Sequence, residues 1–223
     1  MKRMNDALKM PVLIIYVIIF YSIWTVWEFW IRTFISNTFG NEYISQLIKS
    51  GIIKNSVWTF PAILLVWHFK SDVYITLKEM FSTKVNWLKY LPIFIFFTIY
   101  ILAGAILKNS GVEIVKDFGI DKIIIVLFVG LTEEMVFRGW LLNATIHENR
   151  KWFYIIINAA MFLVIHFPIW IYSGNFISYF TSLQFIEVMA LSVIFSTTFI
   201  KSRSILVPIT LHMYFDLLVF MFI

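Results

Sequence analysis

The chain has 223 residues, of which 61% are hydrophobic and 14% are charged, and its formal net charge is +5. This hydrophobic fraction, with a mean hydropathy of +0.85, exceeds that of a soluble domain and indicates an integral membrane protein. The absence of cysteine excludes disulfides, thiolate metal sites and cysteine nucleophiles. Basic residues are scattered over short hydrophilic breaks, which argues against nucleic-acid binding.

Seven apolar runs have the length of about 17–25 residues that a membrane-spanning helix needs. All seven are expected to be α-helical, because lipid offers the backbone no hydrogen-bond partners. The second run is interrupted by Lys54, Asn55 and Pro61, so a re-entrant or interfacial segment is the alternative there. The sequence therefore predicts an all-α polytopic bundle of about seven membrane-spanning helices, forming one integral membrane domain over residues 1–223. The runs cover residues 11–32, 52–69, 90–107, 122–146, 152–172, 182–200 and 205–223.

The hydrophilic segments between the apolar runs, called breaks below, alternate between the two sides of the membrane, and lysine and arginine are distributed unequally between the two sides. Because cytoplasmic loops carry the excess of these residues, the imbalance of eleven to six favours a cytoplasmic N-terminus, with Arg138 inside the membrane. The eleven basic residues assigned to the cytoplasmic side, the larger set, are Lys2, Arg3, Lys9, Lys70, Lys78, Lys84, Lys89, Arg150, Lys151, Lys201 and Arg203. The smaller set comprises Arg32, Lys49, Lys54, Lys108, Lys116 and Lys122.

The first run, residues 11–32, is rich in aromatic residues and lacks a small-residue cleavage site, so we expect it to remain in the mature protein. Trp24, Trp27 and Trp30 within it are expected to face lipid or the interfacial belts, where aromatic residues concentrate.

Three ionisable residues, Glu133, Glu134 and Arg138, lie in the middle of the run 122–146. Each would cost roughly 2.5–3.5 kcal/mol at the centre of a membrane helix unless it is paired or hydrated. Glu134 and Arg138 are four residues apart and can neutralise each other along one helix face. Glu133 points about 100° away from Glu134 and must find its partner on another helix. A purely structural ion-pair network is the alternative to a catalytic role.

Other polar residues are expected at a similar depth. Glu133, His166 and Asp216 each lie on the order of 20 Å from the cytoplasmic end of their run, and His212 roughly 14 Å, at about 1.5 Å per helical residue. His212 and Asp216 are four residues apart, so they project from one face of their helix. The similar depths predict one enclosed cavity. The structural alternatives are an interhelical contact for His166 and a mutual pair for His212 and Asp216.

These residue types suit peptide hydrolysis by activated water. A carboxylate in a low-dielectric cavity is a stronger base for removing a proton from water. Imidazoles can share that proton, donate to a developing oxyanion, or bind a metal. The sequence contains no evident serine or cysteine nucleophile with a dedicated base and no HExxH motif, so a zincin arrangement is not expected.

Three short segments resemble the motifs of one protein family. EEMVFRG at residues 133–139 resembles the EExxxR motif of the CPBP family, the CAAX protease and bacteriocin-processing (Abi) family of intramembrane proteases. FLVIH at 162–166 is similar to its second motif, FxxxH, and HMYFD at 212–216 to its third, HxxxN or HxxxD. All three lie in order within predicted spans, over a family-like catalytic core of about residues 120–223.

The resemblance implies a CAAX-type intramembrane endopeptidase that hydrolyses a peptide bond of a membrane-embedded or lipidated peptide or protein. It implies that Glu133 activates water together with His166, while His212 and Asp216 line the oxyanion side. The location it implies is multi-pass in the lipid bilayer, which we expect to be a bacterial plasma membrane. No nucleic-acid partner is expected.

In the same resemblance, Glu134 and Arg138 support the site by holding the helix and the catalytic carboxylate in place. This role agrees with the neutralisation that their spacing allows.

Family members are often described as metalloproteases, although a metal-free, glutamate-dependent mechanism is also proposed for them. The candidate ligands for Zn²⁺ are Glu133, His166, His212 and Asp216, which are residue types of catalytic zinc sites. Asp216 stands where the motif often has Asn, and an aspartate donates a hydrogen bond only when protonated, which favours either a metal ligand or a raised pKa at this position. Residues that orient metal-bound histidines are not identifiable. We therefore favour a mechanism without a cofactor, with Zn²⁺ as the alternative.

Two other functions compete with proteolysis. A protein of the same fold can provide bacteriocin self-immunity, or bind a peptide, without cutting it. A proton-coupled transporter that uses Glu133 is the second alternative, but the hydropathy shows no inverted duplication of the kind found in many transporters.

Overall fold

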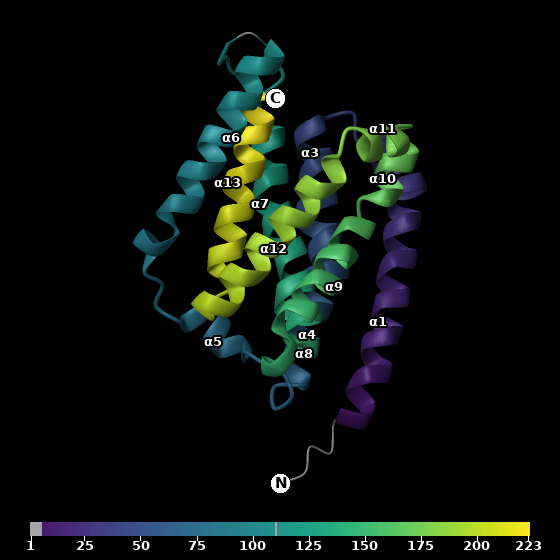
Figure 1. Ribbon diagram of the computed structural model, residues 1–223. Coiled ribbons are helices and arrows are strands. Elements are labelled where there is room, and N and C mark those ends of the chain that lie inside the picture. Colours follow the sequence, from purple (N-terminus) through teal and green to yellow (C-terminus); the bar gives the residue numbers. More distant parts are fainter. Residues whose placement is uncertain (1–5, 110) are drawn as a thin grey trace.

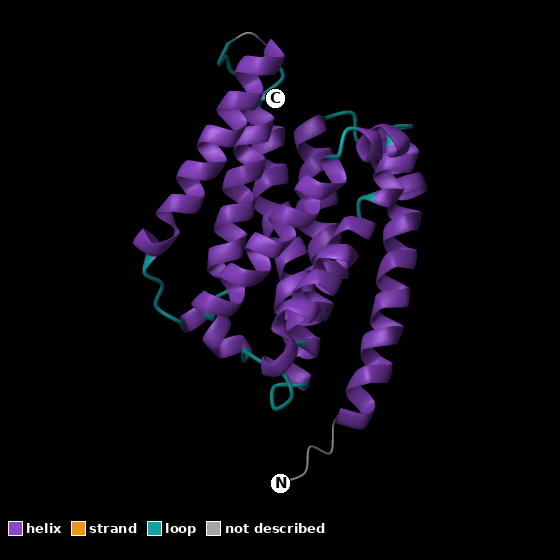
Figure 2. Ribbon diagram, viewed as in Figure 1, coloured by secondary structure: helices purple, strands orange, loops and turns teal. Residues whose placement is uncertain are grey.

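The computed structural model describes residues 6–109 and 111–223, which form helices and loops without a strand (Figures 1 and 2). Lys2 and Arg3 of the larger basic set lie outside the described residues. The helices run side by side as a bundle, which confirms the predicted all-α fold (Figure 1).

Three of the long helices contain π-helical turns and continue through them. They are α1 (Asp6–Val26) with η1 (Trp27–Ile31) and α2 (Arg32–Thr38); α3 (Glu42–Gln46) with η2 (Leu47–Thr59) and α4 (Phe60–His68); and α7 (Ile120–Glu134) with η4 (Met135–Leu142) and α8 (Asn143–Thr145). The other helices are α5 (Leu77–Ser82), η3 (Trp87–Tyr90), α6 (Leu91–Asn109), η5 (Glu148–Arg150), α9 (Lys151–Val164), α10 (Phe167–Tyr172), α11 (Phe176–Thr181), α12 (Gln184–Ser202) and α13 (Leu206–Phe222).

The seven predicted runs all fall on helices. Four helices are long and apolar enough to cross a membrane, and a shorter apolar helix covers Leu206–Phe222. The two remaining runs lie in the helices 42–68 and 120–145, which contain the intramembrane charges. The four long apolar helices are Leu8–Thr38, Trp87–Asn109, Glu148–Tyr172 and Gln184–Ser202.

The predicted start of the second run at residue 52 is wrong. The helix begins at Glu42, where the Asn41 side chain caps it by accepting a hydrogen bond from the Ile44 N–H at 3.2 Å. It then continues through Lys54 and Asn55 without a re-entrant turn. Hydropathy missed this start because the first turns of the helix are polar.

Hydrogen bonds connect three hydrophilic breaks at one end of the bundle. The Tyr74 hydroxyl donates to Glu148 at 2.8 Å, and Arg203 donates to Glu79 at 3.0 Å. Thr76 and Glu79 form a capping box at the start of α5, and the Thr76 backbone N–H holds the pKa of the Glu79 carboxyl below its usual value. The breaks 70–89, 147–151 and 201–204 therefore share one end, as the topology prediction requires.

The break between α6 and α7 lies at the opposite end, beside the end of α13 (Figure 1). There the Val115 N–H donates to the Met221 carbonyl at 2.9 Å, and Lys108 donates to the Ile223 carbonyl at 2.9 Å. The end that carries this break is the one that the basic-residue bias predicts to be extracytoplasmic.

This orientation can be tested with single cysteines, because the chain has none of its own. Val112 and Lys201 are exposed at opposite ends of the bundle. An impermeant thiol reagent added to intact cells is expected to label Val112→Cys several-fold more strongly than Lys201→Cys, with equal labelling after permeabilisation. Equal labelling in intact cells would contradict the orientation. Ser110, in the same break as Val112, lies outside the described residues.

Gly130 allows α7 and α13 to approach each other closely. A Cβ atom at this position would lie 2.7 Å from Cγ of Met213 and 3.3 Å from the Ile209 carbonyl oxygen. Small residues permit such contacts between membrane helices. The close approach places the end of α7, with its two glutamates, beside the middle of α13.

The prediction that the tryptophans of the first run face lipid is wrong for two of the three. Trp24 and Trp27 are each only 5% exposed, whereas Trp30 is 63% exposed. Trp24 turns inward because its indole N–H donates to the Ile165 carbonyl at 2.6 Å, next to the turn that carries His166. The first helix therefore contributes to the interior of the bundle.

Candidate active site

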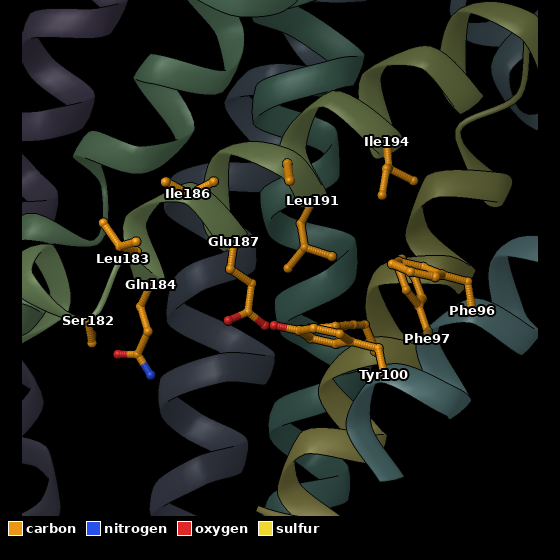
Figure 3. A pocket seen from close by; sticks show the side chains of 12 residues that line it. Phe96, Phe97, Tyr100, Ser182, Leu183, Gln184, Ile186, Glu187, Leu191 and Ile194 are labelled. Carbon is orange, nitrogen blue, oxygen red and sulfur yellow. The ribbon is translucent and has the colours of Figure 1, made fainter. Parts of the chain in front are cut away.

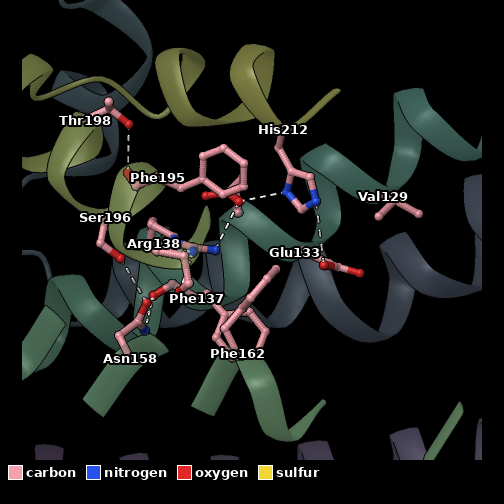
Figure 4. A network of polar contacts seen from close by, with 12 residues as sticks. Val129, Glu133, Phe137, Arg138, Asn158, Phe162, Phe195, Ser196, Thr198 and His212 are labelled. Carbon is pink, nitrogen blue, oxygen red and sulfur yellow. Dashed lines mark hydrogen bonds and ion pairs between the residues drawn. The ribbon is translucent and has the colours of Figure 1, made fainter. Parts of the chain in front are cut away.

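The predicted site residues come from three helical segments and one turn. Glu133 and Glu134 end α7, Arg138 lies in η4, and His166 lies in the turn between α9 and α10. His212 and Asp216 occupy adjacent turns of α13. Figure 4 shows the central part of this arrangement, with His212 between Glu133 and the Arg138 network.

Arg138 is completely buried and anchors this network. Its Nη1 donates to Oε1 of Glu134 at 3.0 Å, and neither side chain is exposed to solvent. Its Nη2 donates to the Ser192 hydroxyl at 2.7 Å and to the Ser192 carbonyl at 3.1 Å. The guanidinium carbon lies 4.6 Å from the centre of the Phe162 ring. The predicted pair of Glu134 and Arg138 is thus present, and it ties η4 to α12.

Glu134 also orients His212. Nδ1 of His212 lies 2.8 Å from Oε1 of Glu134. A carboxylate paired with arginine can only accept, so Nδ1 carries the proton of this hydrogen bond. The Phe195 ring is stacked on the imidazole at 4.9 Å. Nε2 consequently points the other way, 4.0 Å from Oε2 of Glu133 and 3.6 Å from Oδ2 of Asp216.

The two ring nitrogens of His166 also have different roles. Its Nδ1 lies 2.9 Å from the Phe162 carbonyl, which only accepts, so Nδ1 is the donor. Nε2 therefore keeps its lone pair. Pro168 lies in the first turn of α10 and lacks an N–H, so the helix is interrupted at the turn that carries His166. The turn holds the imidazole in place while leaving Nε2 free to act.

Glu133, His166 and Asp216 line one cavity of about 310 Å³. His212 adjoins this cavity through the two carboxylates that its Nε2 faces. Three of the four residues predicted to share a cavity thus line it directly, and the fourth contacts two of them. The arrangement places a possible base, an unprotonated imidazole nitrogen and a second imidazole around a space large enough for part of a peptide.

Sequence reasoning missed two further residues of this cavity, Lys54 and Glu28. Lys54 was interpreted only as an interruption of a span, and Glu28 was not singled out. Both were detectable in principle, because a charge within an apolar run is a functional-site hypothesis by default.

A second cavity, of about 550 Å³, lies between α6 and α12 (Figure 3). Glu187 projects into it and lies beside Tyr100 (Figure 3). The predicted catalytic residues do not line this space. Glu187 is thus an intramembrane carboxylate without a catalytic set around it.

The fit of a metal can be tested on the donor atoms. Among the described residues, no group of three or more His, Cys, Asp or Glu side chains is arranged to hold a metal ion. One nitrogen of His212 is occupied by Glu134, and one nitrogen of His166 by a backbone carbonyl. The candidate Zn²⁺ ligands therefore do not form a three-ligand set in this arrangement.

Elemental analysis of the purified protein is expected to find substoichiometric zinc, and chelation is expected to leave cleavage unchanged. Both results follow from the lack of a converging ligand set around Glu133 and Asp216. Stoichiometric Zn²⁺ that is lost together with activity in His166→Ala and His212→Ala, and restored activity on metal add-back, would overturn this expectation.

Comparison with known proteins adds one finding to this geometry. Residues 118–218 match the family described as type II CAAX prenyl endopeptidase Rce1-like. Neither the comparison with curated proteins nor that with solved structures gave a match. Together with the apolar helices, the family match indicates an integral membrane protein. The match confirms the resemblance to the CPBP family: residues 118–218, which contain all three motifs, are similar to the Rce1-like CAAX endopeptidase family.

Proposed function

We propose that this protein is a CAAX-type intramembrane endopeptidase that hydrolyses a peptide bond of a membrane-associated peptide or protein through water activated by Glu133. The observation that carries the proposal is the cavity inside the helix bundle lined by Glu133, His166 and Asp216. The family match supports endopeptidase chemistry in general. The roles of the individual residues are inferred from their geometry.

In the proposed first step, a water molecule in the cavity donates hydrogen bonds to the Glu133 carboxylate and to the free Nε2 of His166. Glu133 removes one proton as the water oxygen attacks the peptide carbonyl. A carboxylate in a low-dielectric cavity is a stronger base than one in water, which suits this task. His166 holds the attacking oxygen in position, because its own orientation is fixed by the Phe162 carbonyl.

The attack places negative charge on the former carbonyl oxygen. Nε2 of His212 faces the cavity carboxylates, and in its protonated form it can donate to that oxyanion. Asp216, 3.6 Å from the same nitrogen, favours this orientation of the ring. The proton held by Glu133 then moves to the leaving amine, which restores the carboxylate and breaks the peptide bond.

The experiment that tests the proposal is cleavage of labelled membrane-associated peptides by purified protein in liposomes, with products identified by mass spectrometry. Products that require Glu133 support an endopeptidase. Saturable peptide binding without any product would instead favour the peptide-binding or immunity alternative. Proton flux without a product would favour a transporter.

A further inference from the structure

A third cavity, of about 400 Å³, adjoins the active-site cavity. We call it the outer vestibule. It lies towards the end of the bundle that carries the break between α6 and α7, since Lys122 at the start of α7 is among its lining residues. The two cavities have five lining residues in common, namely Glu28, Lys54, Ile125, Val129 and Phe220. Because the two cavities share this wall, a substrate can reach Glu133 from that end through the outer vestibule.

Lys54 lies where the two cavities meet. Its ammonium group is 4.6 Å from the ring centre of Trp24 and 5.3 Å from that of Trp58. Within the described part of the chain, it makes no ion pair with a carboxylate. Glu28, the carboxylate that both cavities share with Lys54, is paired with Arg32 at 2.9 Å. Lys54 thus presents a positive charge to the active-site cavity that no carboxylate of the described residues neutralises by contact.

The side chains that line the outer vestibule carry more positive than negative charges. Four cationic and two anionic side chains line it, and Lys49 bonds a hydroxyl, that of Ser36 at 3.0 Å, rather than a carboxylate. A cleft lined by one sign of charge and by low-dielectric walls concentrates ligands of the opposite sign. The cationic residues are Arg32, Lys49, Lys54 and Lys122, and the anionic ones are Glu28 and Glu42.

We propose that Lys54 binds a carboxylate group of the peptide substrate, which reaches it through the outer vestibule. The inference rests on the proposed function, because it assigns a substrate group to the same cavity. An ammonium group packed against two indole rings is held in place and partly shielded from water, and both effects strengthen a charge-assisted hydrogen bond to a carboxylate. Lys54 lies outside residues 118–218, so this specificity comes from a part of the chain that the family match does not cover.

The carboxylate comes either from the end of the peptide or from an aspartate or glutamate side chain, and matched peptides separate these sources. One labelled peptide ends in a free carboxylate, a second ends in an amide, and a third ends in an amide but contains Asp in place of Asn. Binding is measured by fluorescence anisotropy in a Glu133→Gln background, so that no peptide is consumed. Cleavage kinetics are measured in parallel with Glu133 intact. Each set compares Lys54 with Lys54→Met and Lys54→Arg.

With Lys54 present, the peptide carrying the decisive carboxylate is expected to bind about tenfold more tightly than its uncharged counterpart. Lys54→Met should abolish this difference and raise KM for the charged peptide by a similar factor relative to KM for the uncharged one. Lys54→Arg should keep most of the difference. Lys78→Met, which removes an exposed lysine at the opposite end of the bundle, is the charge-matched control and should behave as the parent.

Equal binding of charged and uncharged peptides would overturn the inference, as would a discrimination that survives in Lys54→Met. An equal loss of kcat for both peptides, with the ratio of their KM values unchanged, would also overturn it, because Lys54 would then act on Glu133 instead of on the substrate. If no peptide is cleaved but the Lys54-dependent discrimination in binding persists, the proposed function fails and the carboxylate site stands.

Discussion

Glu133→Gln is expected to reduce peptide turnover by about 10²–10⁴-fold, the usual contribution of a general base, while the protein stays folded. The amide has the size and shape of the carboxylate but cannot accept a proton from water. Its Oε2 atom lies 4.0 Å from Nε2 of His212, beyond hydrogen-bond distance, so the substitution breaks no close ion pair. The measurement is kcat in liposomes, with thermal unfolding of the same preparation.

The matched control for this prediction is Glu187→Gln. Glu187 is also a glutamate on a membrane helix and lines a cavity, but none of the predicted catalytic residues shares that cavity (Figure 3). Its substitution is expected to leave kcat within about twofold of the wild type, since surroundings without a base, an imidazole or a bound reacting group contribute nothing to the chemical step. A well-folded Glu133→Gln protein that still cleaves at the wild-type rate would remove Glu133 from its role.

Much of the fold follows from the sequence because hydropathy responds to the same property that drives helices into lipid. All seven predicted runs are helical, yet the helix of the second run starts at Glu42 instead of residue 52. Its polar first turns have no hydropathy signal, and the Asn41 cap is a local hydrogen bond that an average over many residues conceals. The π-helical turns of η2 and η4 were not predicted either, since they depend on the packing of neighbouring helices.

The grouping of site candidates from α7, α13 and the turn after α9 around one cavity was predictable for a different reason. Depth along a helix is a simple function of residue number, so Glu133, His166 and Asp216 could be placed at one level before their contacts were known. The rotation of a helix about its own axis is not set by depth. Trp24 was therefore assigned to lipid although it faces the cavity, and Lys54 was not recognised as its neighbour.

The partners of Glu134 show that sequence spacing predicts contacts within one helix but not contacts between helices. Its pairing with Arg138 follows from a spacing of four residues within one helix. Its hydrogen bond to His212 joins residues that are far apart in the sequence, and it depends on the close approach of α7 and α13 at Gly130. Sequence spacing therefore predicts the ion pair but not the histidine that shares the same oxygen.

Breaking the pair between Glu134 and Arg138 is expected to destabilise the protein severely. Removing one partner of a buried ion pair leaves an uncompensated charge and lowers the free energy of unfolding by about 3–5 kcal/mol. Both side chains are 0% exposed, so water cannot take the place of the lost partner. Arg138→Met and Glu134→Gln should each show a loss of this size when the protein is unfolded by SDS in mixed micelles.

The double variant is the informative one, because it removes both charges together. Within the described residues, Oε2 of Glu134 and Nε of Arg138 have no hydrogen-bond partner, so the pair is not fully satisfied even when intact. Replacing an incompletely satisfied buried pair by neutral groups is often tolerated. We therefore expect the double variant to lose about 0.5–3 kcal/mol less than the sum of the two single losses, the range of coupling that residues in contact show.

The pair of Glu28 and Arg32 provides a matched control for this cycle. It has the same spacing of four residues and a similar distance of 2.9 Å, but the Arg32 side chain is 44% exposed. Solvent screens such a pair, so Glu28→Gln with Arg32→Met should show a coupling of only about 0.3–0.5 kcal/mol. A similar coupling in the two cycles, or additive effects of Glu134→Gln and Arg138→Met, would contradict a structural role for the buried pair. A large coupling confined to Glu134 and Arg138 would show that burial, and not spacing, makes this pair hold the catalytic helix.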